Sequence, residues 1–181
     1  DQTDVFSPSP SVQVGLLTFG DGEVSIPEPL GPADPFFETT EPDSSEDADL
    51  EKEDADLEKY LDPARPENSV SYTGNTPMAG ALVAADDHLR TATNARPGAE
   101  KSVLLVTDGG PNYDATSYTV TVDGESEFTV SWTPGSGEDP APSGEGSGEV
   151  NEGELRDTAT QAASVRGNGT DILVAGLLTD A

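Results

Sequence analysis

The fold of this chain is decided by residues 101–114, which read Lys-Ser-Val-Leu-Leu-Val-Thr-Asp-Gly-Gly-Pro-Asn-Tyr-Asp. The apolar run from Val103 to Val106 predicts a strand buried on both faces, as strands of parallel sheets are. Ligands of open α/β sheets bind beyond the carboxyl ends of the strands, so Asp108 is a candidate functional carboxylate. A strand that simply ends in an Asp-Gly turn has the same sequence, so this stretch alone leaves both interpretations open.

The remaining apolar segments predict the rest of an α/β sheet. Three further strands are expected: a core strand at 12–19, a short edge strand at 23–26 and a last buried strand at 171–178. Helices are expected at 77–93, where Thr76 would be the N-cap, and at 153–165. This order predicts a mostly parallel central sheet covered by helices on both faces.

Two stretches are predicted as insertions into this sheet. Residues 27–66 are rich in proline and acid, and the repeat Asp-Ala-Asp-Leu-Glu-Lys within 47–60 predicts a surface helix. Residues 115–150 combine a β-hairpin at 117–132, turning at Asp123-Gly124, with a loop rich in Gly, Ser and Pro. A length of 181 residues suits one domain, 1–181, with these insertions.

The charge of the chain limits its partners. Asp and Glu number 36 against 8 Lys and Arg, a formal net charge of −28. Such a surface repels nucleic acid and anionic lipid, and it attracts cations and basic proteins. Concentrated salt would screen the self-repulsion, so a salt-adapted source is one hypothesis. No apolar run approaches the roughly 20 residues of a membrane span, and cysteine is absent. The start at Asp1, without a Met, leads us to expect a processed product or an excised segment.

Four segments of the chain resemble, in their order, the von Willebrand factor A (VWA) domain of bacterial and archaeal surface or secreted proteins. They are Val-Gly-Leu-Leu-Thr-Phe (14–19), Gly-Asn-Thr-Pro-Met-Ala-Gly-Ala-Leu (74–82), Val-Leu-Leu-Val-Thr-Asp-Gly-Gly-Pro-Asn (103–112) and Asp-Ile-Leu-Val-Ala-Gly-Leu (171–177). The resemblance implies a Rossmann-like sheet with a MIDAS-like cation site at its top. It implies Thr76 and Asp108 as ligands of Mg²⁺ or Ca²⁺, and Asn112 on the partner-binding face. Hydroxyl and carboxylate oxygens suit these ions.

The chain departs from the family at its first metal-binding loop. No Asp-x-Ser-x-Ser element occurs in the sequence, and the strand and helix that carry it in the family would precede Val12. Thr76 and Asp108 are therefore expected to form an incomplete site. Either the chain is an internal piece of a longer domain, or the full site has been lost. For Thr76, a plain helix N-cap is the competing interpretation.

The expected function is that of a non-catalytic protein-binding or adhesion module at the cell surface or outside the cell. A metal-free structural or assembly protein with the same fold is the alternative, and a metal-dependent hydrolase built on the acids is a third. His88, the single histidine, has no evident acid–base partner, so we do not expect an enzyme. Asp86 and Asp87 are expected on a solvated helix face, and Asn168-Gly169-Thr170 fits the N-glycosylation sequon.

Overall fold

The structure is a computed structural model that describes residues 12–20, 22–33, 75–107, 109–113, 115–133 and 152–176. Contacts within the chain divide it into two units, residues 1–15 with 31–71 and residues 16–30 with 72–181. In the first unit the described residues are 12–15 and 31–33, which belong to or border the strands β1 and β2. The second unit contains both described helices. A single domain across the whole chain stays a prediction.

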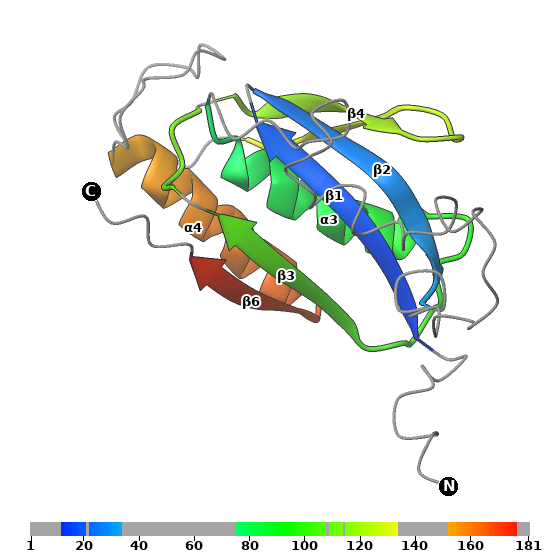
Figure 1. Ribbon diagram of the computed structural model, residues 1–181. Helices are drawn as coiled ribbons and strands as arrows, with labels where there is room; N and C mark the ends of the chain where they lie inside the picture. Colours follow the sequence, from blue (N-terminus) through cyan, green and yellow to red (C-terminus); the bar gives the residue numbers. More distant parts are fainter. Residues whose placement is uncertain are drawn as a thin grey trace, which may run out of the picture. The chain divides into compact units, whose positions relative to one another are not determined.

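The described residues combine strands and helices, so the mixed α/β class expected from the sequence is confirmed (Figure 1). The elements in chain order are β1 (Gln13–Gly20), β2 (Glu23–Pro32), α3 (Met78–Thr91), β3 (Lys101–Thr107), β4 (Ser117–Val122), β5 (Phe128–Ser131), α4 (Glu152–Gly167) and β6 (Thr170–Gly176). The acidic repeat at 47–60 and the loop at 134–150 lie outside the described residues. Within the described part, neither helix is long and apolar enough to cross a bilayer.

The strands form two sheets where one central sheet was expected. One sheet has the order β1-β2-β4-β5, and the other pairs β3 with β6. The β2–β4 and β3–β6 pairs are parallel, whereas β4 and β5 form the antiparallel hairpin that the sequence predicted. Gly124 has a φ of 67° in the hairpin turn, a left-handed conformation that glycine adopts without strain. Among the described residues, no ladder of hydrogen bonds joins the two sheets.

Strand β2 corrects the prediction of a short edge strand at 23–26 followed directly by an inserted segment at 27–66. It continues to Pro32 and lies inside its sheet, between β1 and β4. The predicted hairpin pairs along it, so Val24 and Ile26 are buried. The ladder with β4 spans only residues 24–26, before Pro27, because proline cannot donate to a ladder.

Helix α3 is buried on two sides. Ala84 is fully enclosed, whereas Ala85 and Leu89 are only half-buried. The helix packs against β3, β4, β5 and α4. On one side, Ala84 meets a cluster centred on β2 and β4; on the other, Met78 and Leu82 join a cluster with Leu105 of β3 and Val165 of α4.

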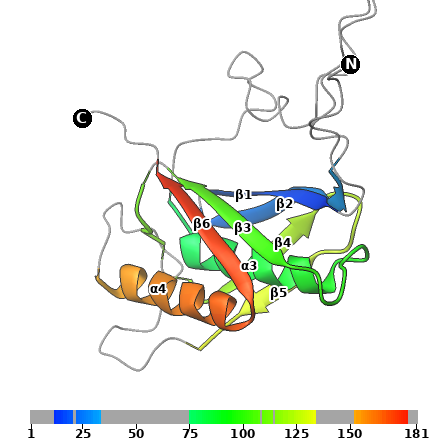
Figure 2. The same cartoon turned by 90° about the horizontal axis from the view of Figure 1, so that it is seen from below.

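The β3–β6 pair corrects a second prediction, that both of these strands are buried on both faces. Helices α3 and α4 cover one face, where Leu105 is buried (Figure 2). On the opposite face, Leu104, Leu173 and Val106 are 65%, 58% and 49% exposed. Parallel pairs normally carry a cover on both faces. No described helix or strand packs on this outer face of β3–β6.

A buried carboxylate ties α3 to the turn between α4 and β6, contrary to the expected solvated face. Asp86 is 5% exposed, and its two oxygens accept hydrogen bonds from Arg90 Nε and Nη2, Asn168 Nδ2 and Thr170 Oγ1, at distances of 2.5–3.1 Å. Burial raises the pKa of Asp86, but these hydrogen bonds outweigh it and leave the pKa below its usual value. The sequon nitrogen of Asn168 is thus hydrogen-bonded to Asp86, although Asn168 itself is an exposed residue.

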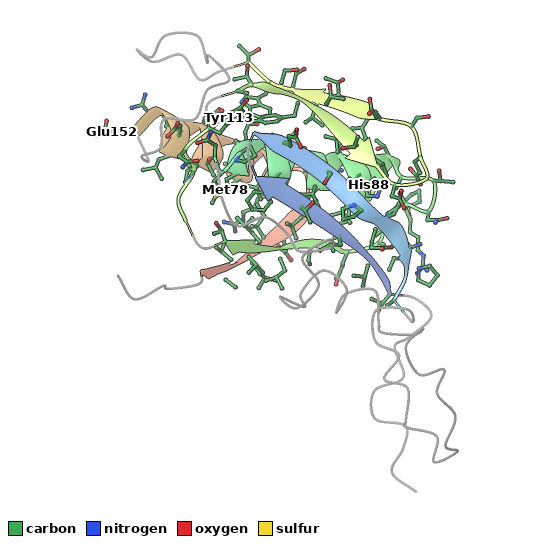
Figure 3. All side chains as sticks on the ribbon, turned by 45° about the horizontal axis from the view of Figure 1, so that its top comes forward. Met78, His88, Tyr113 and Glu152 are labelled. Carbon is green, nitrogen blue, oxygen red and sulfur yellow. The ribbon has the colours of Figure 1, made fainter. Side chains whose placement is uncertain are left out.

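His88, towards the opposite end of α3 from Met78 (Figure 3), is a structural residue of the core. Its Nε2 accepts a hydrogen bond from the backbone N–H of Leu30 at 3.0 Å, and its ring stacks on Phe128 at 6.4 Å. Burial lowers the pKa of His88 by more than the charges of Glu125 and Asp87 raise it. Neutral His88 therefore helps to hold the distal part of β2 on α3.

Replacement of the buried Asp86 carboxylate should destabilise the protein far more than replacement of its partly exposed neighbour Asp87. Asp86→Asn leaves Arg90 without its charged partner, and we expect a loss of about 2 kcal/mol in the free energy of unfolding, because Arg90 is partly solvated. Asp87→Asn makes the same charge change one residue away and should cost less than about 0.5 kcal/mol. Urea unfolding of both variants at one salt concentration measures the difference. Equal losses would contradict the structural role of Asp86.

Stability should also fall as the pH falls through the titration range of His88. Folded His88 has a lowered pKa, whereas the unfolded residue titrates near 6.5, so the unfolded state takes up the proton first. Between about pH 7.5 and 5.5, the free energy of unfolding should decrease by at most about 1.4 kcal/mol per pH unit. His88→Gln keeps an acceptor for Leu30 and cannot titrate, so its slope in urea unfolding should be smaller. An unchanged slope would assign the pH dependence to other groups.

Candidate functional site

Two loops that the sequence singled out meet at the carboxyl end of β3. The backbone N–H of Thr76, just before α3, donates a short hydrogen bond to Asn112 Oδ1. In return, the N–H of Asn112 donates to the Thr76 carbonyl oxygen at 3.4 Å. These residues are 36 positions apart in the sequence, so the double contact fixes the loop after β3 against the start of α3.

Two hydrogen bonds join Thr107 to Gly109. Thr107 Oγ1 donates to the Gly109 carbonyl oxygen at 2.9 Å, and the Gly109 N–H donates back to Thr107 Oγ1 at 3.3 Å. Threonine hydroxyls commonly make such local bonds to the backbone. Asp108 itself lies outside the described residues, so its predicted role as a ligand remains a prediction.

Thr76 is not the side-chain cap of α3, so that prediction was wrong. Pro77 occupies the N-cap position, and no side-chain cap hydrogen bond is present. The Thr76 backbone carbonyl oxygen accepts from the Met78 N–H at 2.9 Å instead. Within the described part of the chain, the Thr76 hydroxyl makes no hydrogen bond that caps the helix. The competing interpretation of Thr76 as a plain helix N-cap is therefore not supported.

A row of aromatic side chains packs next to the loop that contains Asn112. Tyr113, next to Asn112, packs so closely on Gly22 that a Cβ there would lie 2.5 Å from the ring. Tyr113 contacts Tyr118 of β4 with ring centroids 6.1 Å apart, and Tyr118 stacks on Trp132 at 5.8 Å. The Trp132 indole N–H then donates to both carboxylate oxygens of Asp157 on α4, at 3.0 and 2.8 Å.

Sequence reasoning missed Tyr113 and its partner Gly22, which lies in the turn between β1 and β2. The predicted hairpin at 117–132 includes Tyr118 and Trp132, but local alternation does not indicate that Tyr118 contacts Tyr113.

The described side chains do not by themselves make a metal centre. Among them, no three His, Asp or Glu residues are close enough to hold an ion. Thr76 and Asn112 contribute neutral oxygens, so the charge for a cation would have to come from Asp108 or from groups that approach from elsewhere. The structure thus brings together Thr76 and Asn112, two of the three predicted site residues, and both side chains are neutral.

Comparison of the chain with models of known protein families, with curated proteins and with solved structures finds no match. The resemblance to VWA domains therefore remains an inference from the four sequence segments.

Removal of the Asn112 acceptor should release the loop. Asn112→Ala leaves the Thr76 N–H without its acceptor, and we expect about 1 kcal/mol less stability and faster amide exchange at Thr76. Asn112→Asp keeps an oxygen in the same place and should retain most of the protection. Hydrogen–deuterium exchange of peptides covering 75–80 is the measurement. Unchanged exchange in Asn112→Ala would mean that the Thr76–Asn112 contact does not hold these loops together.

Proposed function

We propose that the protein is a non-catalytic, VWA-type binding module that recognises another protein at the cell surface or outside the cell. Thr76, Asp108 and Asn112 would form its recognition site, and a divalent cation would be held there by an incomplete set of ligands. Thr76 would coordinate the cation directly or through water, and Asp108 would supply charge, through a bound water. The observation that carries the proposal is the double contact between Thr76 and Asn112 at the carboxyl end of β3.

The position and chemistry of this contact support the proposal. In sheets with parallel strands, ligands bind where the strands end, and the loop after β3 and the start of α3 meet at that place. The Thr76 hydroxyl is not used as a helix cap, so it is available to a cation or a partner. Mg²⁺ keeps several waters, so a site with few protein ligands can bind it and leave positions for a partner's carboxylate.

The net charge narrows the class of partner. With a net charge of −28, the surface favours a partner of positive charge or one bridged by a cation. The same charge makes nucleic acid and anionic membranes poor partners. A basic protein, or a carboxylate-bearing protein joined through the bound cation, fits both the charge and the site.

A metal-free structural or assembly protein is the second candidate. The observation that favours it is the exposed apolar face of β3 and β6, since exposed faces of this kind mark surfaces that associate. In that case Thr76 and Asn112 would serve only to fix the loop after β3.

A cation titration separates the two functions. If the proposal is right, Mg²⁺ or Ca²⁺ should bind saturably with a dissociation constant of about 10⁻⁴–10⁻³ M, as weak extracellular modules do. Asp108→Asn should abolish this binding, and Thr76→Val should weaken it about tenfold or more because it removes only the hydroxyl. Isothermal titration in a buffer of fixed ionic strength is the measurement.

Matched variants control for the overall acidity of the chain. Asp87→Asn makes the same charge change as Asp108→Asn on an outer position of α3, and Thr76→Ser restores the hydroxyl; both should bind the cation like the unaltered protein. Equal losses in Asp87→Asn and Asp108→Asn would mean diffuse counterion binding. That result, or no saturable binding at millimolar metal, would favour the metal-free alternative.

A further inference from the structure

The turn after α4 contains a chemically labile pair of residues. Asn168 is followed by Gly169, and no other asparagine of the sequence precedes a glycine. Both residues are exposed, in the turn where α4 leads directly into β6 (Figure 2). Asparagine is one of the thermolabile residues of proteins, because the backbone nitrogen of the next residue can attack its side-chain amide. Glycine favours this attack, since it has no Cβ to hinder the approach.

The reaction at such a pair converts asparagine into an acid without an enzyme. The Gly169 nitrogen loses its proton and forms a bond to Asn168 Cγ, while Nδ2 leaves as ammonia, and a cyclic imide results. Water then opens the imide. Attack of water at Cγ gives aspartate, and attack at the backbone carbonyl carbon gives isoaspartate, in which the main chain runs through Cβ.

One contact in the structure favours the attack. Arg90 Nη2 donates a hydrogen bond to the Asn168 carbonyl oxygen at 2.7 Å. This oxygen and the Gly169 nitrogen belong to the same peptide group. The guanidinium cation therefore stabilises the negative charge that spreads over the group when the nitrogen loses its proton.

Two other contacts hold the pair in an unreactive arrangement. The Gly169 N–H donates to the Arg166 carbonyl oxygen at 2.9 Å, so the nitrogen keeps its proton. Asn168 Nδ2, the group that has to leave, donates to Asp86 Oδ2 at 2.8 Å. Gly169 ends the helix with a φ of 86°, as glycine does at many helix ends. The reaction therefore needs a local opening of this turn, and helix ends open by ordinary fluctuations.

The product does not fit the contacts that Asn168 makes. A carboxylate in place of the amide cannot donate to Asp86, and it brings a second negative charge to the same place. Isoaspartate also lengthens the main chain just before Thr170, the first residue of β6, whose hydroxyl donates to Asp86 as well. Either product removes a contact that joins α3 to the turn between α4 and β6.

We propose that Asn168 is a site of spontaneous deamidation, and that this modification irreversibly releases α3 from the turn between α4 and β6. Opening of the helix end permits the reaction, and the acid that forms prevents the turn from closing on Asp86 again. The contact is intact in newly made protein and is lost as the protein ages. The inference rests on the contacts of Asn168 and stands whether or not a cation binds near Thr76.

Ageing of the full chain tests the chemistry. The protein is kept at mildly alkaline pH, where peptide nitrogens lose their protons more readily, and tandem mass spectrometry of its peptides follows the conversion of each asparagine. Asn94 is a matched control within the chain, since it is also exposed and its amide donates to the Leu30 carbonyl oxygen, but it precedes alanine. Asn168 should convert about tenfold faster than Asn94, or more.

A pair of variants tests the control by Asp86. Asp86→Asn takes away the carboxylate that holds Asn168 Nδ2, and conversion of Asn168 should become about fivefold faster, which corresponds to the loss of one hydrogen bond. Asp87→Asn makes the same charge change one residue away and should leave the rate unchanged. Circular dichroism checks that both variants stay folded during the incubation.

An exchange of the two side chains tests the consequence. Asn168→Asp imitates the aspartate product, and its equilibrium constant of unfolding should rise about tenfold or more because two carboxylates meet. The double variant Asp86→Asn with Asn168→Asp again has one carboxylate and one amide, in exchanged places. It should therefore lie closer to the unaltered protein than either single variant does. Urea unfolding of all these proteins at one pH and one salt concentration measures the coupling.

Any of three results would overturn the proposal. Conversion at Asn168 no faster than at Asn94 would show that the pair is not a reactive site. Equal rates in Asp86→Asn and Asp87→Asn would show that the contact with Asp86 does not control the reaction. Additive losses of stability in the double variant would show that the acid formed at Asn168 does not act through Asp86.

Discussion

The second unit is organised around the close approach of α3 to the hairpin strand β4. At Gly80, a Cβ would lie 2.6 Å from the ring of Tyr118, so the helix can reach this distance only where it has no side chain. Ala84, one turn further along the helix, is fully buried and belongs to the same apolar cluster as Tyr118. Because small residues line this helix, it can be covered on two sides and still leave Met78 and Leu82 for the cluster under β3.

Helix α3 also carries polar groups into the interior, so not every acidic residue of this chain belongs to its surface. Asp86 is not part of a solvated acidic surface; it accepts hydrogen bonds from three side chains and joins α3 to the end of α4. His88 is held neutral by burial and accepts from the backbone of β2. Interior charges of this kind respond to their partners, whereas the surface acids respond to salt.

Local sequence signals by themselves determined the elements of this protein. The strand at 103–106, the hairpin around Asp123-Gly124 and the helix expected at 153–165 were all predicted, because strand, turn and helix depend on neighbouring residues. The pairing of two distant motifs also led to Thr76 and Asn112, which do meet. Only the tertiary structure decided what those elements face. The exposure of Leu104, the burial of Asp86 and the interior position of β2 depend on partners far away in the sequence, and such contacts leave no trace in local periodicity.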